Sequence, residues 1–150
     1  MKHVWVLAIL CLAPTLHALE VQVGSSFTIT GIMRQEGKPL LPQQRTYYDI
    51  RIMDRNTYDF VATCHEPCKQ TVGQVDVAVE EVRPAKTHPD MWIVSVRISP
   101  GWLVTFLVFR EGNNRWSVKN PAHFKFLDKS LQTQTREKII ATVGGISHAV

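Results

Sequence analysis

Apolar and polar residues alternate with a period of two along most of this 150-residue chain. Successive side chains of a β-strand point to opposite faces of its sheet, so this alternation predicts strands that each bury one face. The segments that show it are residues 27–33, 48–52, 58–63, 74–79, 92–98 and 116–118. The pattern therefore favours a fold built from β-sheets.

Residues 102–109 differ from these segments because both of their faces are apolar, and only Thr105 interrupts the run. Such a run predicts a central strand that is covered on both sides. Short connections separate it from 92–98 and 116–118, and connections this short join antiparallel neighbours. We therefore expect these three segments to form a meander. The prolines at 39 and 42 argue against a central strand in that region.

Residues that recur at helical spacing mark the C-terminal tail. They are Leu131, Thr135, Ile139, Ile140 and Val143. Asp128 or Ser130 is the candidate N-cap, because a side-chain oxygen there accepts a hydrogen bond from a free N–H of the first turn. Gly144-Gly145 is the predicted end of the helix. Residues 138–143 also fit a last strand, and the helix is the favoured interpretation.

The composition is that of an ordinary globular domain, since 45% of the residues are hydrophobic and 20% are charged. It argues against a disordered tail, a coiled coil, a collagen and a polytopic membrane protein. The predicted fold is a single all-β domain with a short C-terminal helix. We expect an antiparallel β-sandwich or partly open barrel of about seven strands.

Residues 1–18 have the layout of a cleaved signal peptide, which leaves 19–150 as a single β-rich exported domain. Lys2 supplies a positive charge, residues 4–13 are almost wholly apolar, and Ala18 precedes the expected cut. An apolar run of about ten residues is too short to cross a bilayer. The expected location is the periplasm or the exterior of the cell, with no transmembrane span after cleavage. An uncleaved anchor is the alternative.

Charge is distributed unevenly along the chain. Residues 19–109 hold nine Lys or Arg and ten Asp or Glu, a net charge of −1. Residues 110–150 hold seven and three, a net charge of +4. A basic C-terminal third suits an anionic lipid, a glycan or an acidic protein, and a merely solvated surface is the simpler alternative. Nucleic acid is not an expected partner, because the protein is expected to be exported and has no recognised binding motif.

The segment Cys64-His65-Glu66-Pro67-Cys68 is the densest group of reactive side chains. Cys11 lies in the predicted signal peptide, where Leu10 argues against a lipidated cysteine. Two cysteines remain after cleavage, an even number that suits an oxidising compartment. We expect a structural disulfide between Cys64 and Cys68, across a tight turn at the end of the strand predicted at 58–63. The chain-entropy estimate for so small a ring is about 2 kcal/mol.

Two further interpretations give these cysteines a chemical role. A redox site needs a reactive thiolate beside a resolving thiol, and its usual spacing has two intervening residues rather than three. A metal site would use Cys64, His65 and Cys68 as ligands for copper(I) or zinc. Such a site would need a fourth ligand from elsewhere in the chain. Neither a metal nor any other cofactor is expected.

Aromatic and basic residues intermingle in the C-terminal third and suggest a binding surface. The residues assigned to this surface are Arg110, Arg115, Trp116, Lys119 and Lys125. Protein interfaces are enriched in aromatic residues and Arg. The simpler alternative is that Trp116 and Phe124 are core residues whose charged neighbours lie on the outer face.

Motifs of common enzymes are absent from the sequence, including the Gly-x-Ser-x-Gly elbow, the HExxH pair, the phosphate loop and the dinucleotide fingerprint. The sequence therefore favours a non-enzymatic exported binding or accessory protein. Two candidates within this class are an accessory of envelope assembly and an immunity or inhibitor protein. The expected partner is another envelope or secreted protein. The alternative function is a redox or metal-handling protein that acts through the Cys64–Cys68 loop.

Overall fold

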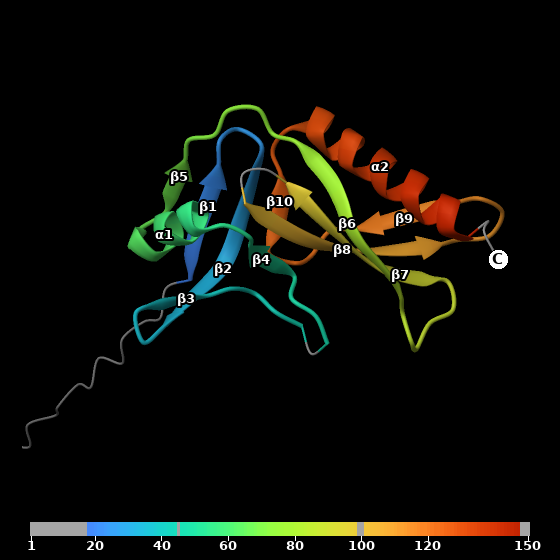
Figure 1. The fold of residues 1–150 in the computed structure, drawn as a ribbon, viewed down its shortest axis with the longest axis horizontal. Coiled ribbons are helices and arrows are strands. Elements are labelled where there is room, and N and C mark those ends of the chain that lie inside the picture. Colours follow the sequence, from blue (N-terminus) through green and yellow to red (C-terminus); the bar gives the residue numbers. More distant parts are fainter. Residues whose placement is uncertain (1–17, 45, 99–100, 148–150) are drawn as a thin grey trace, which may run out of the picture.

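Two β-sheets packed against each other, with a helix at the C-terminus, make up the fold in the computed structural model (Figure 1). The structure describes residues 18–44, 46–98 and 101–147. It confirms the all-β, sandwich-like fold predicted from the alternation. The predicted signal peptide and Cys11 lie outside the described residues, except for Ala18.

The first sheet joins strands from both ends of the chain. Its members are β1 (Leu19–Val23), β2 (Phe27–Gln35), β3 (Lys38–Leu40), β5 (Cys68–Gln70) and β10 (Phe124–Phe126). Their order is β10-β2-β1-β5, and β3 pairs with β2 beyond this path. The β1–β5 pair is parallel, whereas the other pairs are antiparallel. A parallel pair needs a long crossover, which the chain between β1 and β5 supplies.

The second sheet contains the predicted meander. Its members are β4 (Ile50–Ile52), β6 (Val77–Pro84), β7 (Met91–Ile98), β8 (Trp102–Arg110) and β9 (Trp116–Lys119). Strands β7, β8 and β9 follow one another as antiparallel neighbours. Strand β8 pairs with β7 along one edge and with β4 and β9 along the other. This confirms the central strand that the doubly apolar run predicts.

The prediction of a strand at 58–63 is wrong, because Arg55–Thr63 form helix α1. Asp54 is the N-cap of this helix, and its carboxylate accepts a hydrogen bond of 2.7 Å from the backbone N–H of Thr57. Thr57 and Val61 are four residues apart and bury the same helical face. Over so few residues the apolar positions fit a period of two as well as the helical period, and the cap decides between them.

The predicted C-terminal helix is confirmed as α2 (Lys129–Ser147). Asp128 is its N-cap, since its Oδ1 accepts a hydrogen bond of 2.8 Å from the backbone N–H of Ser130. The buried stripe, with a spacing of four, consists of Leu131, Thr135, Ile139 and Val143. The predicted end at Gly144-Gly145 is wrong. Neither glycine has a positive φ, and the helix continues to Ser147.

Several strand boundaries differ from the predicted ones, and ten strands are present among the described residues rather than about seven. Strand β4 begins at Ile50 and leaves Tyr48 outside it, in an isolated bridge to Gln43. Strand β6 begins at Val77 and ends at Pro84, which an edge strand tolerates. The strands without a prediction are the short members of the first sheet, β1, β3, β5 and β10.

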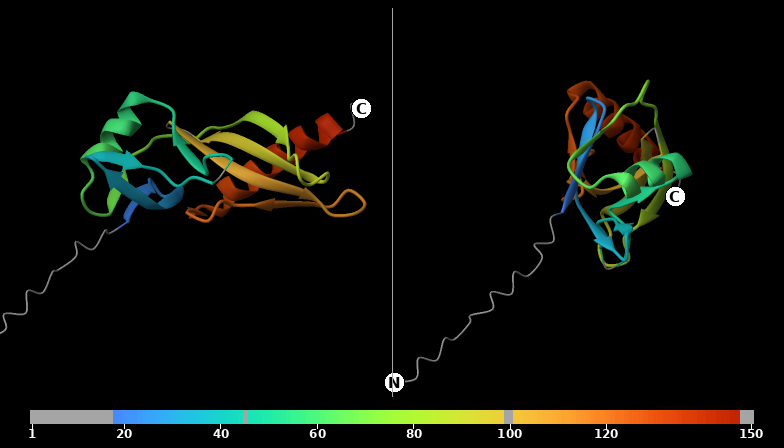
Figure 2. Two further views of the ribbon diagram at one scale, coloured as in Figure 1. Left: turned by 90° about the horizontal axis from the view of Figure 1, so that it is seen from below. Right: turned by 90° about the vertical axis from the view of Figure 1, so that its left-hand side faces the viewer.

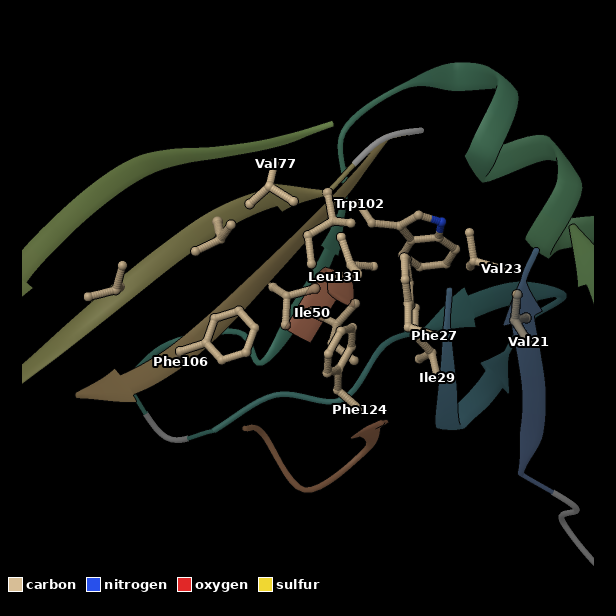
Figure 3. Packing of buried hydrophobic residues seen from close by; sticks show 14 of the residues in the cluster. Val21, Val23, Phe27, Ile29, Ile50, Val77, Trp102, Phe106, Phe124 and Leu131 are labelled. Atoms are coloured by element: carbon tan, nitrogen blue, oxygen red, sulfur yellow. The ribbon is translucent and has the colours of Figure 1, made fainter. Parts of the chain in front are cut away.

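Both sheets contribute to one hydrophobic core, shown in Figure 3. Phe27 and Ile29 enter it from the first sheet, and Trp102 and Phe106 enter it from the second; all four are fully buried. The indole Nε1 of Trp102 donates a hydrogen bond of 3.1 Å to the side-chain oxygen of Gln70 on β5. This bond satisfies two buried polar groups and ties the two sheets together.

The two helices lie at opposite ends of the molecule (Figure 2). Helix α2 packs against β6 and β10, and α1 contacts β3. Within the described residues, neither helix has the length and apolar character needed to cross a membrane.

Candidate functional site

A disulfide joins Cys64 and Cys68, as predicted. Its setting differs from the expected one. Cys64 caps the C-terminus of α1, and Cys68 is the first residue of β5. The bond therefore links the end of a helix to an edge strand of the first sheet, and Cys64 is buried in the core.

The redox and metal interpretations both need the sulfur atoms of Cys64 and Cys68, and in this structure these two atoms are bonded to each other. His65 is exposed between the two cysteines. Among the described residues, no group of three or more His, Cys, Asp or Glu side chains is arranged to hold a metal ion. Metal binding at Cys64, His65 and Cys68 would first require reduction of the bond, because the thiolate is the ligand.

Arg110 and Trp116 meet at the end of the β8–β9 hairpin, as cross-strand partners. The Arg110 guanidinium forms an ion pair of 2.8 Å with Asp90 and lies 5.7 Å from the ring centre of Trp92. Trp92 packs on Trp116, with ring centres 5.4 Å apart. Arg115 is exposed in the turn that precedes Trp116. These aromatic and basic side chains are therefore partly engaged with one another.

The remaining residues of the predicted binding surface lie elsewhere. Lys119 pairs with Leu107 on the outer face of the second sheet, opposite in orientation to Trp116. Lys125 pairs with Thr28 in the first sheet and lines a hollow of about 440 Å³ there. Phe124 is buried in the core. The five predicted residues thus do not form one continuous surface.

A groove of about 330 Å³ lies where β3, β4 and α1 approach one another. Its apolar lining includes Leu40 and Leu41 from the β3 end, Ile52 from β4 and Tyr58 from α1. Arg51 is the only charged side chain among its described lining residues. This hollow is called the groove below.

Exposed apolar side chains gather at the groove. Leu40 is 42% exposed, Tyr48 49%, Met53 44% and Tyr58 37%. They account for four of the six large hydrophobic side chains that are exposed in the described part of the chain. Three of them line the groove, and Met53 follows the lining residue Ile52. Single exposed apolar residues are common on protein surfaces, whereas a large contiguous apolar patch is a feature that interaction sites often have.

Strand β4 has an open edge beside the groove. The backbone N–H of Met53 donates to Gly101, and that of Thr105 donates to Asp49, so Asp49 and Met53 are hydrogen-bonded positions of the antiparallel ladder. Because such positions alternate, the N–H and C=O groups of Ile50 and Ile52 point away from β8. Within the described residues, β4 has no strand partner on that side.

A second hollow, called the polar pocket below, lies on the outer face of the second sheet and measures about 200 Å³. Its described lining consists of Thr46, Tyr47, Tyr48, Arg51, Glu81, Arg83, Ser95 and Thr105. The groove and the polar pocket share Tyr48 and Arg51. The Arg51 guanidinium lies 5.4 Å from the ring centre of Tyr48, which is a cation–π geometry.

The sequence did not indicate these two hollows. Tyr48 fits the alternation that also includes Ile50 and Ile52, which predicts that it is buried, yet the strand begins after it. Pro39 and Pro42 were a signal that was present, since prolines are confined to edge strands and irregular segments: Pro39 lies in the short strand β3, and Pro42 lies in the irregular segment that follows it. The meeting of this segment with α1 depends on tertiary structure, and local patterns do not report it.

Comparison with known proteins finds no matching family model, no matching curated protein and no matching solved structure.

Proposed function

We propose that this chain is an exported, non-enzymatic binding protein that captures an extended segment of a partner protein at the groove. The observation that supports this most directly is the gathering of Leu40, Tyr48 and Tyr58, all exposed, around one hollow. The hollow adjoins a strand edge with open backbone groups. A site that combines apolar side chains with an open edge is suited to a polypeptide in extended conformation.

The occupant we favour is a segment of another envelope or secreted protein that carries a large apolar side chain beside an acidic residue. Its backbone would pair with Ile50 and Ile52, and its apolar side chain would enter the groove. Arg51 is the one charged group in the groove's described lining, and its only ring or ion-pair contact among the described residues is with Tyr48. An uncompensated guanidinium favours a negatively charged neighbour on the ligand.

Export is supported by two independent features. Residues 1–18 have the charge and hydropathy layout of a signal peptide. The Cys64–Cys68 disulfide suits an oxidising compartment such as the periplasm or the exterior of the cell. An accessory of envelope assembly and an immunity or inhibitor protein both match a protein of this kind, and the identity of the partner separates them.

Site-specific photo-crosslinking in the native host tests this function. A benzophenone amino acid at position 58 places the reactive group in the groove, and the same amino acid at position 127 is the matched control, since Leu127 is 44% exposed and lies outside the groove. We expect a discrete adduct from position 58 whose cross-linked peptide, identified by mass spectrometry, is one extended segment of one exported protein. A Leu40→Asp substitution should abolish this adduct.

Two results contradict the proposal. One is an adduct pattern that is the same from positions 58 and 127. The other is an adduct that survives Leu40→Asp but is lost with Arg115→Glu or Lys125→Glu, which would assign capture to the basic residues of the C-terminal third. Circular dichroism of each variant establishes that a lost adduct does not reflect a lost fold.

A further inference from the structure

The polar pocket is rich in hydrogen-bond donors. Its lining residues Thr46, Tyr47 and Tyr48 carry hydroxyl groups, and Arg51 carries a guanidinium. Glu81 is the only carboxylate in its described lining, and it is already paired with Arg83 at 3.2 Å. An arrangement with many donors and one engaged carboxylate suits a ligand that only accepts hydrogen bonds.

The lining of the pocket includes two buried residues that carry hydroxyl groups. Ser95 is 8% exposed and Thr105 is 4% exposed, and their hydroxyl oxygens are 3.3 Å apart. Two hydroxyl groups that share one hydrogen bond have one hydrogen left to donate. Among the hydrogen bonds of the described residues, neither hydroxyl has another acceptor. A donor of this kind in the lining of a pocket is available to an entering ligand.

The two arginines of the pocket differ in their partners. Arg83 is neutralised by Glu81, whereas Arg51 contacts the face of the Tyr48 ring. The guanidinium that remains to meet an anion is therefore that of Arg51. The phenol of Tyr47 adds a donor that stays protonated, because burial and, to a smaller extent, the charge of Asp49 raise its pKa above 10.0.

The geometry of β4 connects the polar pocket to the groove. Ile50 and Ile52 face the core side and line the groove, whereas Arg51 lies between them, faces outward and lines the polar pocket as well as the groove. Neighbouring residues of a strand added to this edge would also point to opposite faces. One residue of such a segment would then reach the groove, and the next would reach the polar pocket.

We infer that the polar pocket binds a side-chain carboxylate of the partner segment, at the residue adjacent to the apolar one in the groove. This inference rests on the proposed function. The recognised motif is an apolar residue followed or preceded directly by Asp or Glu, in extended conformation. Arg51 pairs with the carboxylate, and the hydroxyl groups of Tyr47 and of the Ser95–Thr105 pair complete its hydrogen bonds.

Three peptides used as probes test the motif by NMR titration of the purified, disulfide-bonded protein. They are acetyl-Thr-Phe-Asp-Thr-amide, the same peptide with Asn in place of Asp, and the same peptide with Ala in place of Phe. We expect the Phe-Asp peptide to shift the backbone amide signals of Thr105 and Ile52 and to bind about tenfold more tightly than the Asn peptide. Sodium acetate and inorganic phosphate, each alone, are further arms of the titration.

Variants assign the preference to the pocket. Arg51→Met should remove the difference between the Asp and Asn peptides while the preference for Phe over Ala remains. Arg51→Lys should retain part of that difference, because the charge is kept and the planar guanidinium is lost. Arg97→Met is the matched control. Arg97 is an exposed arginine of the same sheet that pairs with Glu80 at 3.0 Å and lies outside the pocket's described lining.

Equal binding of the Asp and Asn peptides overturns the carboxylate site. If Phe is still preferred over Ala in that case, the groove and the proposed function stand alone. Stronger shifts at Thr105 with phosphate than with any peptide would assign the pocket to a free anion and would also overturn the inference. If no peptide binds at millimolar concentration, the carboxylate site is wrong, and the cross-linking from position 58 decides the groove separately.

Discussion

The guanidinium of Arg34, on β2, donates a hydrogen bond of 2.9 Å to the carbonyl oxygen of Ala62 in the last turn of α1. The same nitrogen also donates to the carbonyl oxygen of Cys64. The last carbonyl groups of a helix lack partners within the helix, and a cation placed there is favourable. Helix α1 has no basic residue in its own last turn, so a strand of the first sheet supplies this cap.

The Arg34 cap makes a strong prediction for stability. Arg34→Met removes hydrogen bonds from a charged donor to partly buried carbonyl groups, which should lower the free energy of unfolding by about 2 kcal/mol. Arg34→Lys keeps the charge but loses the fork geometry, so its loss should be smaller. Urea denaturation of both variants measures this. Equal stability of the methionine variant and the wild type would show that the cap contributes little.

The disulfide ties the same helix end to β5. Replacing Cys64 and Cys68 with Ser together should lower the free energy of unfolding by about 2 kcal/mol, as expected for a ring of this size. Partner capture at the groove should persist wherever the variant is folded. Urea denaturation and the cross-linking from position 58 measure the two effects.

The redox or metal-handling alternative predicts the opposite result for this pair. Under that alternative, the double serine variant keeps its stability and loses activity. Intact mass of the protein purified from its native compartment adds an independent check. The structural disulfide is supported if the chain starts at Leu19, has a mass lower by two hydrogens than that of the reduced chain, and resists alkylation until it is reduced. Free thiols or an added metal mass support the alternative.

Long, regular segments allowed prediction of most of the second sheet, because alternation over seven or more residues distinguishes a strand from a helix. Residues 92–98 show this alternation, whereas residues 102–109 were predicted from an apolar run that covers both faces, and both strands are present at nearly these bounds. Helix α1 was not predictable in the same way. Whether this segment forms a helix or a strand depends on the Asp54 cap and on Arg34, which lies twenty residues before Asp54 in the sequence.

The candidate site was less predictable than the fold. The disulfide followed from the short spacing of Cys64 and Cys68, and it is confirmed. Tyr48 and Arg51 carry no local signal of a binding site, because Tyr48 fits the alternation of a strand and exposed Arg residues occur on any surface. What makes them a candidate site is their position between two hollows at an open edge of β4. That position arises only when the segment after β3 folds back over the second sheet.

Tyr47 gives the stability of the protein a specific dependence on alkaline pH. Burial raises the pKa of its phenol above 10.0, and the charge of Asp49 adds to this. The folded state therefore favours the protonated phenol. This contribution is complete below pH 10.0 and disappears as the pH rises through the folded-state pKa. Tyr47→Phe should remove this part of the alkaline loss of stability.

Chemical denaturation of the wild type and the Tyr47→Phe variant, between about pH 9 and 12, measures the difference. Other groups titrate in this range in both proteins, so the comparison isolates Tyr47. If the free energies of unfolding of the wild type and the variant change with pH in parallel over the whole range, the prediction is wrong.

Glycine substitutions in α2 and at Gly31 should change stability in opposite directions. Gly144 and Gly145 lie in α2 without a positive φ, and a Cβ at either position meets no atom within 4 Å. Gly144→Ala and Gly145→Ala should each stabilise the protein by about 0.5–1 kcal/mol, because alanine loses less conformational freedom in a helix. Gly31 has a φ of 72°, and a Cβ there would lie 2.6 Å from Nδ1 of His123. Gly31→Ala should destabilise the protein by at least about 1 kcal/mol.

Comparing Gly31→Ala with and without His123→Ala separates two causes of this loss of stability. One is the contact of the new Cβ with the His123 imidazole, and the other is the left-handed backbone conformation at residue 31. Removing the imidazole relieves the contact but leaves the left-handed backbone, so the double variant should recover only part of the stability that Gly31→Ala loses, relative to His123→Ala alone. Thermal unfolding of all variants measures these differences. Complete recovery would assign the requirement for glycine at 31 to the approach of His123, and the absence of any recovery would assign it to the backbone conformation.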